Sequence, residues 1–238
     1  MALTAKPYLR EISIDPGTQF DASAYPFSIP AVGNMNTIKP HADVTFFVGE
    51  NGAGKSTVLE AIAVAMGLPS EGGNRDVYRK EQDVSSLHAC LKLVKSFRKP
   101  RASYFLRAES LFNVFTFYEN AESPRGALHQ RSHGEAFMDV MLDFQAGGLY
   151  LLDEPEAALS PSRQMAALSA IHQLVRDDCQ FIIATHSPIL LSYPHAKILQ
   201  FDGAGITEVA YEDTEHFAIT RDFLNNYEHR LERLLADD

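Results

Sequence analysis

The chain has 238 residues, of which 45% are hydrophobic and 22% are charged, and this composition excludes global disorder. Its 21 basic and 31 acidic residues give a formal net charge of −10, so the charge balance does not indicate a nucleic-acid partner. A local basic stripe could still bind nucleic acid. No apolar stretch approaches the ~18 residues of a membrane span, and no secretory signal opens the sequence. The two cysteines cannot form a disulfide framework, which is typical of a reducing compartment. Together, these features lead us to expect a cytoplasmic protein without direct membrane insertion.

In the first half of the chain, short apolar runs alternate with segments whose apolar residues recur at the spacing of an α-helix. This is the pattern of a parallel sheet with helices on its faces. Strands are predicted over Tyr8–Ile14, Val44–Val48 and Ser103–Arg107. Helices are predicted over Ser56–Met66, where Gly67 would end the helix, over Ser86–Phe97 and over Ser110–Tyr118. In the first strand, Tyr8, Arg10, Ile12 and Ile14 are expected on one side. A cluster of basic residues is expected to be solvated: Lys92, Lys95, Arg98, Lys99 and Arg101.

The same alternation continues to the end of the chain. A helix over Glu135–Gln145 precedes two buried strands, Gly148–Leu152 and Phe181–Ala184. Further helices begin at Ser160-Pro161 and Ser187-Pro188, because serine can cap a helix and proline fits its first position. The last predicted elements are a hairpin of Lys197–Asp202 with Ile206–Tyr211, and an amphipathic helix over Thr220–Leu235.

A glycine-rich segment, Gly-Glu-Asn-Gly-Ala-Gly-Lys-Ser at positions 49–56, matches the pattern GxxxxGK[ST] between a buried strand and a helix. Its glycines let backbone N–H groups turn inward, where the helix N-terminus also favours anions. Lys55 would place a positive charge beside the β- and γ-phosphates, and the Ser56 hydroxyl is an oxygen ligand for Mg²⁺. We therefore expect ATP and Mg²⁺ to bind here. The expected contacts come from Gly49, Asn51, Gly52, Ala53, Gly54, Lys55, Ser56 and Thr57.

Two further segments place polar groups at the carboxyl ends of buried strands. Asp153 and Glu154 follow one strand, and His186 follows the next. Because ligands bind off the carboxyl ends of parallel strands, these side chains are expected to face the pocket of Lys55. Asp153 suits water-mediated binding of Mg²⁺, Glu154 suits orienting the attacking water, and His186 suits a γ-phosphate hydrogen bond. Without a phosphate loop, the two acids would indicate a helix-capping loop and the histidine a structural role.

In this order, these motifs resemble those of the ABC-type ATPases. The resemblance makes residues 49–56 the phosphate loop (Walker A), residues 149–154 the Walker B strand with a catalytic Glu154, and His186 the switch histidine. Ser132-His-Gly-Glu, 21 residues before Asp153, stands where the family carries its signature motif, so Ser132 and Gly134 would contact ATP bound to the opposite subunit. Residues 156–160, Glu-Ala-Ala-Leu-Ser, stand where the D-loop crosses the dimer interface. The chain is most similar to compact bacterial ATPases labelled AAA-family.

The resemblance is incomplete at three places. The signature carries His133 and Glu135 instead of the usual glycine and glutamine, and a helix cap is the alternative role of this segment. The glutamine that the family carries in its Q-loop is missing. Glu109 is the candidate to replace it at the metal site, and the alternative is that Glu109 is an ordinary surface acid. No aromatic residue is assigned to adenine stacking, because core packing is expected for all four candidates: Tyr8, Phe20, Tyr25 and Phe27. A metal pair of His129 and His133 is not expected.

The resemblance implies an α/β P-loop domain of ABC type spanning residues 1–238, with a small antiparallel edge and a reduced helical subdomain at about 69–145. Its activity would be Mg²⁺-dependent ATP hydrolysis in an ATP-sandwiched homodimer, with Lys55, Glu154 and His186 as catalytic residues and Ser56, Asp153 and Glu109 at the metal. The protein could serve as a soluble motor or switch with an unknown partner protein, including a nucleic-acid machine. Alternatives are the nucleotide-binding subunit of a separately encoded membrane transporter and the ATPase half of a defence or toxin pair.

Overall fold

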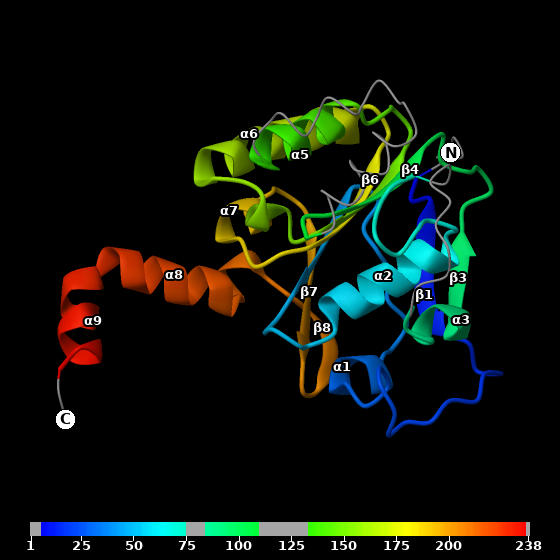
Figure 1. Cartoon of the computed structure of the whole chain (residues 1–238), viewed down its shortest axis with the longest axis horizontal. Coiled ribbons are helices and arrows are strands. Elements are labelled where there is room, and N and C mark those ends of the chain that lie inside the picture. Colours follow the sequence, from blue (N-terminus) through cyan, green and yellow to red (C-terminus); the bar gives the residue numbers. More distant parts are fainter. Residues whose placement is uncertain (1–5, 75–83, 110–132, 237–238) are drawn as a thin grey trace.

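The computed structural model describes residues 6–74, 84–109 and 133–236 (Figure 1). Its centre is a six-stranded sheet with the strand order β4-β5-β6-β2-β7-β8. The strands are β2 (Val44–Val48), β4 (Ser103–Arg107), β5 (Leu149–Asp153), β6 (Gln180–Ala184), β7 (Lys197–Asp202) and β8 (Gly205–Val209). The first five strands in this order are parallel to one another, and β8 is antiparallel to β7 at one edge. This topology confirms the predicted α/β fold with a mainly parallel sheet.

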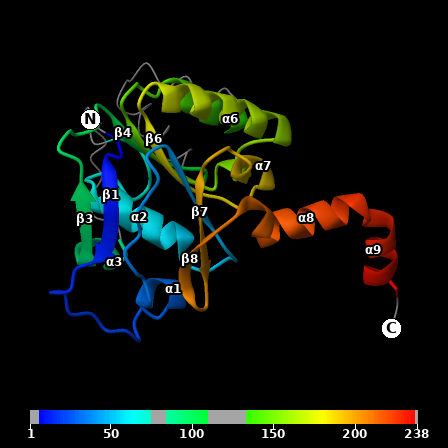
Figure 2. The ribbon, with the colours of Figure 1, turned by 180° about the vertical axis from the view of Figure 1, so that it is seen from behind.

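Helices cover both faces of the sheet (Figures 1 and 2). One face packs against α2 (Lys55–Ala65), and the other packs against α5 (His133–Leu142), α6 (Pro161–Arg176) and α7 (Pro188–Leu191). Side chains alternate along each strand. Phe47 therefore lies in the hydrophobic core between the sheet and α2, and Phe46 lies in the core on the opposite face, and both are fully buried. A strand buried on both faces reads as a continuous apolar run, which is why these strands were predictable.

A second, two-stranded sheet corrects one prediction. The segment expected to be a helix over Ser86–Phe97 is a short helix, α3 (Leu87–Cys90), followed by a strand, β3 (Leu91–Lys95). β3 is antiparallel to β1 (Leu9–Ile14), and its inward residues Leu91 and Leu93 lie opposite Ile14 and Ile12. The helix is predicted from the spacing of Leu87, Leu91 and Val94. Val94 is exposed, because pairing with a strand distant in the sequence turns Leu91 and Leu93 inward instead.

The predicted facing of β1 is also wrong. Its register with β3 shifts between Leu9 and Glu11, so Arg10 is an extra residue in the strand. Such a bulge reverses the side-chain alternation on one side of it. Leu9 and Ile12, expected on opposite sides, are therefore both fully buried, whereas Arg10 is exposed.

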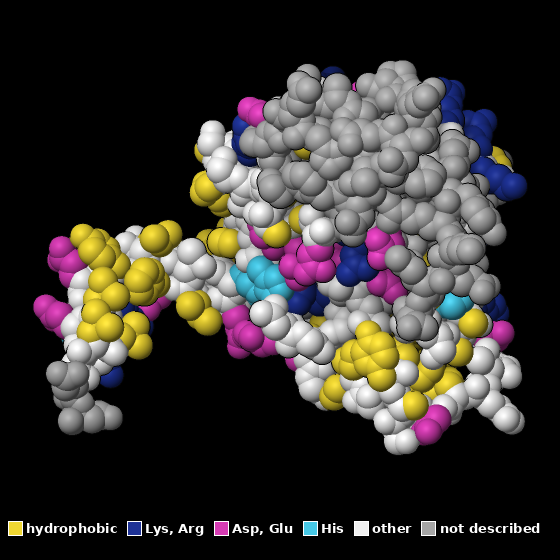
Figure 3. All heavy atoms as spheres, viewed as in Figure 1, with side chains coloured by type: hydrophobic (Ala, Val, Ile, Leu, Met, Phe, Trp, Pro, Cys, Tyr) yellow, Lys and Arg dark blue, Asp and Glu magenta, His cyan; other side chains and the backbone are white. Residues whose placement is uncertain are grey.

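The C-terminal segment differs from the predicted single helix over Thr220–Leu235. A 3₁₀ turn, η3 (Tyr211–Asp213), leads into α8 (Glu215–Asn225), and α9 (Tyr227–Leu234) follows after a break at Asn226. The helix begins earlier because the buried Thr214 hydroxyl caps it, accepting the N–H of Phe217 at 3.3 Å. α8 and α9 extend away from the rest of the described structure (Figures 1 and 2). Apolar side chains are exposed along them (Figure 3): Ile219, Phe223, Leu224, Tyr227, Leu231, Leu234 and Leu235.

The remaining described elements are short. They are α1 (Pro30–Gly33), within the connection before β2, and the 3₁₀ turn η2 (Pro155–Ala157) after β5. The predicted helix over Ser110–Tyr118 lies outside the described residues, as do parts of the expected helical subdomain. The described part of that range combines α3, β3, β4 and α5. The five clustered basic side chains at 92–101 are exposed as expected. In the described part of the chain, no helix is long and apolar enough to cross a membrane.

Candidate nucleotide-binding site

The loop between β2 and α2 adopts a backbone that only glycine accommodates readily. Gly49, Gly52 and Gly54 have φ values of 141°, 79° and 97°. A Cβ atom on Gly49 would lie 2.3 Å from the carbonyl oxygen of Phe201, so this position also has no room for a side chain. Gly54 is the left-handed N-cap of α2, so the loop turns directly into the helix N-terminus. This is the geometry in which backbone N–H groups and the helix dipole bind phosphate.

Lys55 lies inside the curve of this loop. The residue is only 4% exposed, and Nζ donates to the carbonyl oxygens of Gly49 at 2.8 Å and Glu50 at 3.0 Å. Burial lowers the pKa of Lys55, while the carboxylates of Glu154 and Asp153 oppose that shift. The acidic neighbours therefore help to keep a positive charge in the loop, as an anion-binding site requires.

Ser56 and Asp153 are in contact, although they are 97 residues apart. The Ser56 hydroxyl donates to Oδ1 of Asp153 at 2.8 Å, and Oδ2 of the same carboxylate lies 3.3 Å from Nε of Arg107. Burial raises the pKa of Asp153 to about 6, against the lowering effects of Arg107 and the Ser56 hydrogen bond. The contact forms because β5 and β2 are separated in the sheet only by β6.

The donor atoms fit Mg²⁺ held jointly by protein and nucleotide. A hydroxyl and a carboxylate oxygen at 2.8 Å from each other, beside a phosphate-binding loop, match a cation that usually takes one or two protein ligands plus substrate phosphates. Within the described ranges, no group of three or more His, Cys, Asp or Glu residues could hold a metal by itself. The residues present therefore fit ATP together with Mg²⁺.

Glu154 and His186 lie together at the same edge of the sheet. Glu154 has a left-handed backbone (φ 49°) and its N–H donates to the carbonyl of Ala184 at 2.9 Å, which ties the end of β5 to β6. Its Oε1 lies 3.7 Å from Nε2 of His186. Burial, aided by the charge of Lys55, lowers the pKa of His186, so the neutral imidazole is favoured at pH 7.

Glu156, expected only as part of a D-loop, has a structural partner that the sequence did not indicate. Its Oε2 accepts a hydrogen bond from the Thr185 hydroxyl at 2.6 Å, and its Oε1 accepts one from the N–H of His186. Burial raises the pKa of this carboxylate, and the two hydrogen bonds oppose the shift. Glu156 thus joins the loop after β5 to the loop after β6 and fixes the backbone that carries His186.

His216, at the start of α8, is a second residue that sequence reasoning missed. Its Nε2 lies 2.8 Å from Nδ1 of His186. Figure 3 shows histidine side chains beside acidic ones on the face that carries the site. The segment Tyr211-Glu-Asp-Thr-Glu-His belongs to the resemblance, but it does not indicate this contact, because His216 follows His186 by 30 residues and lies on an element outside the sheet.

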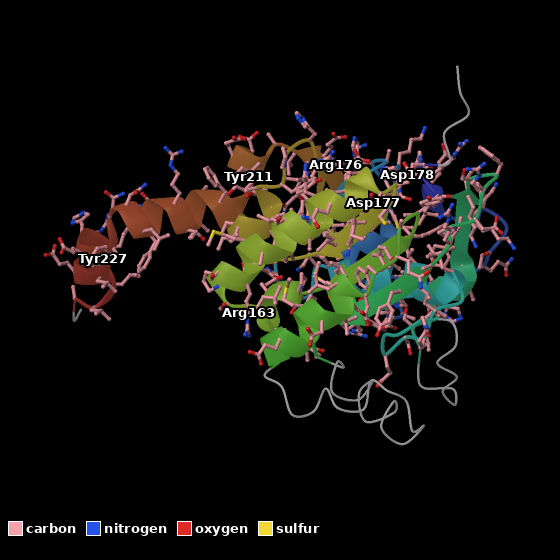
Figure 4. The ribbon with its side chains drawn as sticks, turned by 90° about the horizontal axis from the view of Figure 1, so that it is seen from above. Arg163, Arg176, Asp177, Asp178, Tyr211 and Tyr227 are labelled. Atoms are coloured by element: carbon pink, nitrogen blue, oxygen red, sulfur yellow. The ribbon has the colours of Figure 1, made fainter. Side chains whose placement is uncertain are left out.

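The residues expected at the signature and Q-loop positions are described only in part. Ser132 lies outside the described residues. Gly134 is buried in the first turn of α5, where a Cβ atom would lie 2.8 Å from the carbonyl oxygen of Ala158. Beside it, Nη2 of Arg163 on α6 lies 3.1 Å from Oε1 of Glu135 (Figure 4, Arg163 labelled). The start of α5 therefore packs against residues 156–160. Glu109 is exposed after β4, and its charge raises the pKa of Asp153.

Of the four aromatic candidates, Tyr25 differs from the expectation of core packing. Tyr8 and Phe27 are buried, and the ring of Phe20, which is 37% exposed, stacks on Phe27 at 4.0 Å between centroids. Tyr25 is 65% exposed, and its hydroxyl lies 3.3 Å from Oγ1 of Thr57 in the first turn of α2. An exposed ring beside the phosphate loop is available to a ligand because no core residue covers it.

Two family models match the chain. Residues 29–121 match a model described as an AAA domain. Residues 126–192 match a second AAA-domain model, whose description also names the AbiEii toxin of a type IV toxin–antitoxin system. The phosphate import ATP-binding protein PstB of Corynebacterium efficiens is 25% identical over 199 residues, which cover 70% of this chain and 77% of that protein.

Solved structures of similar shape include the SMC head domain from Thermotoga maritima, with a TM-score of 0.47 and 14% identity over 85% of this chain and 99% of that one. Another is cbiO1 from Clostridium perfringens, part of the ABC transporter complex cbiONQ, with a TM-score of 0.45 and 16% identity over 84% and 89% of the two chains.

The fold and the site define the class of protein. A phosphate-binding loop between β2 and α2, with a hydroxyl–carboxylate pair reaching across from β5, is the site of a P-loop ATPase. The two AAA-domain matches and the ATP-binding relative agree with this class. The chain is a P-loop ATPase.

Proposed function

We propose that this ATPase hydrolyses ATP with Mg²⁺ in a homodimer that sandwiches two nucleotides, and that residues 1–238 act as one catalytic domain. The observation that carries the proposal is the meeting of Ser56, Asp153, Glu154 and His186 at one sheet edge beside Lys55. This set contains a cation that can bind phosphate, two oxygen ligands for a metal ion, a carboxylate that can orient a water molecule, and a neutral imidazole. Groups of this kind bind the phosphates, hold the metal ion and orient the attacking water in γ-phosphate hydrolysis.

Each residue has a separate role in the proposed reaction. Lys55 and the loop N–H groups bind the β- and γ-phosphates. Ser56 directly and Asp153 through water would hold Mg²⁺, with Glu109 as a further candidate, and the ion neutralises charge on the phosphates when bound. Glu154 accepts a hydrogen bond from the attacking water and orients it, while His186 donates one to the γ-phosphate. These groups stabilise charge by position, so little rearrangement of the protein is needed during the reaction.

The packing of α5 supports the dimeric part of the proposal. In one protomer, Gly134 lies against Ala158, and Glu135 is paired with Arg163. The segments expected to cross a dimer interface therefore share one surface. A second copy related by two-fold symmetry would then complete each nucleotide site with its own Ser132 and the backbone of Gly134.

The variant Glu154→Gln tests the proposal most directly. It removes the water-orienting carboxylate but keeps its size, so kcat should fall by ~10²-fold or more while ATP binding persists. Asp153→Asn should instead weaken Mg²⁺-dependent ATP binding, and Lys55→Ala should abolish it. Calorimetric titration with ATP and a phosphate-release assay measure the two properties. Turnover of Glu154→Gln at the wild-type rate would refute this role.

One relative and one family model support two alternative functions. The similarity to PstB supports a nucleotide-binding subunit for a separately encoded transporter, and the second family model supports the ATPase half of a toxin pair. Both use the same catalytic site and differ in the partner protein. Co-purification with the ATP-loaded Glu154→Gln variant would separate them, because a permease or a toxin-pair protein would be retained. The two buried free cysteines fit the reducing cytoplasm in which either would work.

A further inference from the structure

The imidazoles of His186 and His216 are hydrogen bonded to each other. Nδ1 of His186 lies 2.8 Å from Nε2 of His216, and the rings are inclined at 53° with centroids 5.0 Å apart. This inclination rules out a parallel stack. A neutral imidazole has one N–H donor and one acceptor nitrogen, so one ring must donate to the other. The contact therefore links the tautomer of His186 to that of His216.

The proposed reaction requires one of the two tautomers. Nε2 of His186 is buried, lies 3.7 Å from Oε1 of Glu154, and has no hydrogen-bond partner among the described residues. A γ-phosphate oxygen can only accept a hydrogen bond, so Nε2 must carry the proton in order to bind it. Nδ1 of a neutral His186 is then an acceptor, and His216 must donate to it from Nε2.

Both rings lie where the neutral form is favoured. Burial lowers the pKa of His216, and the neighbouring His186 and Lys55 lower it further. Burial and Lys55 have the same effect on the pKa of His186. The protonated pair, with two donors facing each other, is therefore disfavoured near pH 7.

The start of α8 is fixed next to the loop that carries His186. The Thr214 hydroxyl donates to the carbonyl of Tyr211 at 2.7 Å, and the Tyr211 hydroxyl donates to the carbonyl of Pro188 at 2.8 Å. The rings of Tyr211 and Phe217 pack at 4.5 Å between centroids. Figure 4 shows Tyr211 at the base of α8. Because Pro188 is two residues from His186, these contacts hold His216 at a constant position relative to it.

We propose that His216 is a positioning residue for ATP hydrolysis, which holds His186 in the orientation and the Nε2–H tautomer that bind the γ-phosphate. This inference rests on the proposed function of His186. His216 touches no phosphate in this scheme and acts through His186 alone. A partner that sets the tautomer of a functional histidine contributes to the rate because the wrong tautomer offers a lone pair where a donor is needed.

Three substitutions of His216 separate positioning from a structural role. The amide nitrogen of Gln reaches about as far as Nε2 of histidine and can donate, so His216→Gln should keep most of the wild-type kcat. The shorter His216→Asn and the apolar His216→Leu should lower kcat by about 10- to 100-fold, the scale seen when a metal-ligating histidine loses its hydrogen-bond partner. KM for ATP should change much less than kcat, because Lys55 and the N–H groups of the phosphate loop still bind the phosphates. The exposed His229, replaced by Leu, is the matched control and should have no effect.

The side-chain nitrogen NMR signals of His186 report its tautomer, which a simple packing defect would not change. The wild type should show His186 as the Nε2–H tautomer, and His216→Leu should show a mixture of tautomers while its thermal unfolding stays close to that of the wild type. Wild-type kcat in His216→Leu, or His216→Gln as slow as His216→Leu, would overturn the inference. His186→Ala is measured in parallel: a slow His186→Ala beside a fast His216→Leu refutes only this inference, and a fast His186→Ala refutes the proposed function as well.

Discussion

Among the aromatic side chains of the described residues, Tyr25 is the best placed to contact a base at the phosphate loop. It is 65% exposed and lies beside Thr57. Stacking of a base on an aromatic ring is worth about 1–3 kcal/mol. We therefore expect Tyr25→Ala to weaken ATP binding by roughly 5- to 150-fold, while Tyr25→Phe retains most of the affinity. Titration calorimetry with ATP measures both.

The Phe variant is the control for the hydroxyl, because it removes the contact with Thr57 and keeps the ring. Titration with inorganic triphosphate is the control for the base: its affinity should be the same in Tyr25→Ala and in the wild type. An equal loss of affinity for triphosphate and for ATP would contradict stacking on adenine.

At the scale of elements, the start of α7 depends on one hydroxyl. Oγ of Ser187 accepts the N–H groups of Ile189 at 3.1 Å and Leu190 at 3.2 Å, and it donates to Oε1 of the buried Gln164. Ser187→Ala removes the cap and leaves a buried amide oxygen without its donor. We expect the free energy of unfolding to fall by about 1–3 kcal/mol, measured by urea denaturation.

The exposed Ser192, at the other end of α7, is the matched control for this substitution. Its hydroxyl donates to the carbonyl of Ile189 from the surface, so Ser192→Ala should change the free energy of unfolding by no more than about 0.5 kcal/mol. Equal effects of the two substitutions would argue against a special role of the Ser187 cap.

The elements also show what could be predicted from the sequence. The strands of the parallel sheet and the phosphate loop were predictable because their signals are local: an apolar run, a glycine spacing and a capping serine before proline. β3 was not, because its strand conformation depends on pairing with β1, about 80 residues earlier. The contact of His216 with His186 depends in the same way on where α8 packs. Local patterns thus indicated which residues come together at the carboxyl edge of the sheet, but not the side chains, such as His216, that contact them.

At the scale of the whole molecule, ATP is expected to act as the link between two copies. Glu154→Gln with ATP should elute as a dimer in size-exclusion chromatography, and mostly as a monomer without nucleotide. The γ-phosphate bound by one protomer leaves oxygens that the signature segment of the second can satisfy. Ser132→Arg should therefore bind ATP as a monomer, without hydrolysis.

Mixing Ser132→Arg with Lys55→Ala distinguishes this arrangement from a simple helix cap at Ser132. Each protein alone should be inactive, and their heterodimer would hold one intact composite site, so partial activity should return. If Ser132 is only the cap of α5, Ser132→Arg should lose about 1 kcal/mol of stability and keep full ATPase activity.

The place of β2 in the sheet determines when the protein can fold during its synthesis. In the described sheet, β2 lies between β6 and β7 and pairs with both, and Val44 lies opposite Phe181, which follows it by 137 residues. At typical rates of translation, the ribosome needs roughly 7–27 s to make that length of chain. Until then, the apolar run Val44–Val48 has no strand to pair with, and its hydrophobic side chains favour aggregation or chaperone binding. The phosphate loop that follows β2 is therefore among the first functional segments to be made and among the last to take its binding conformation.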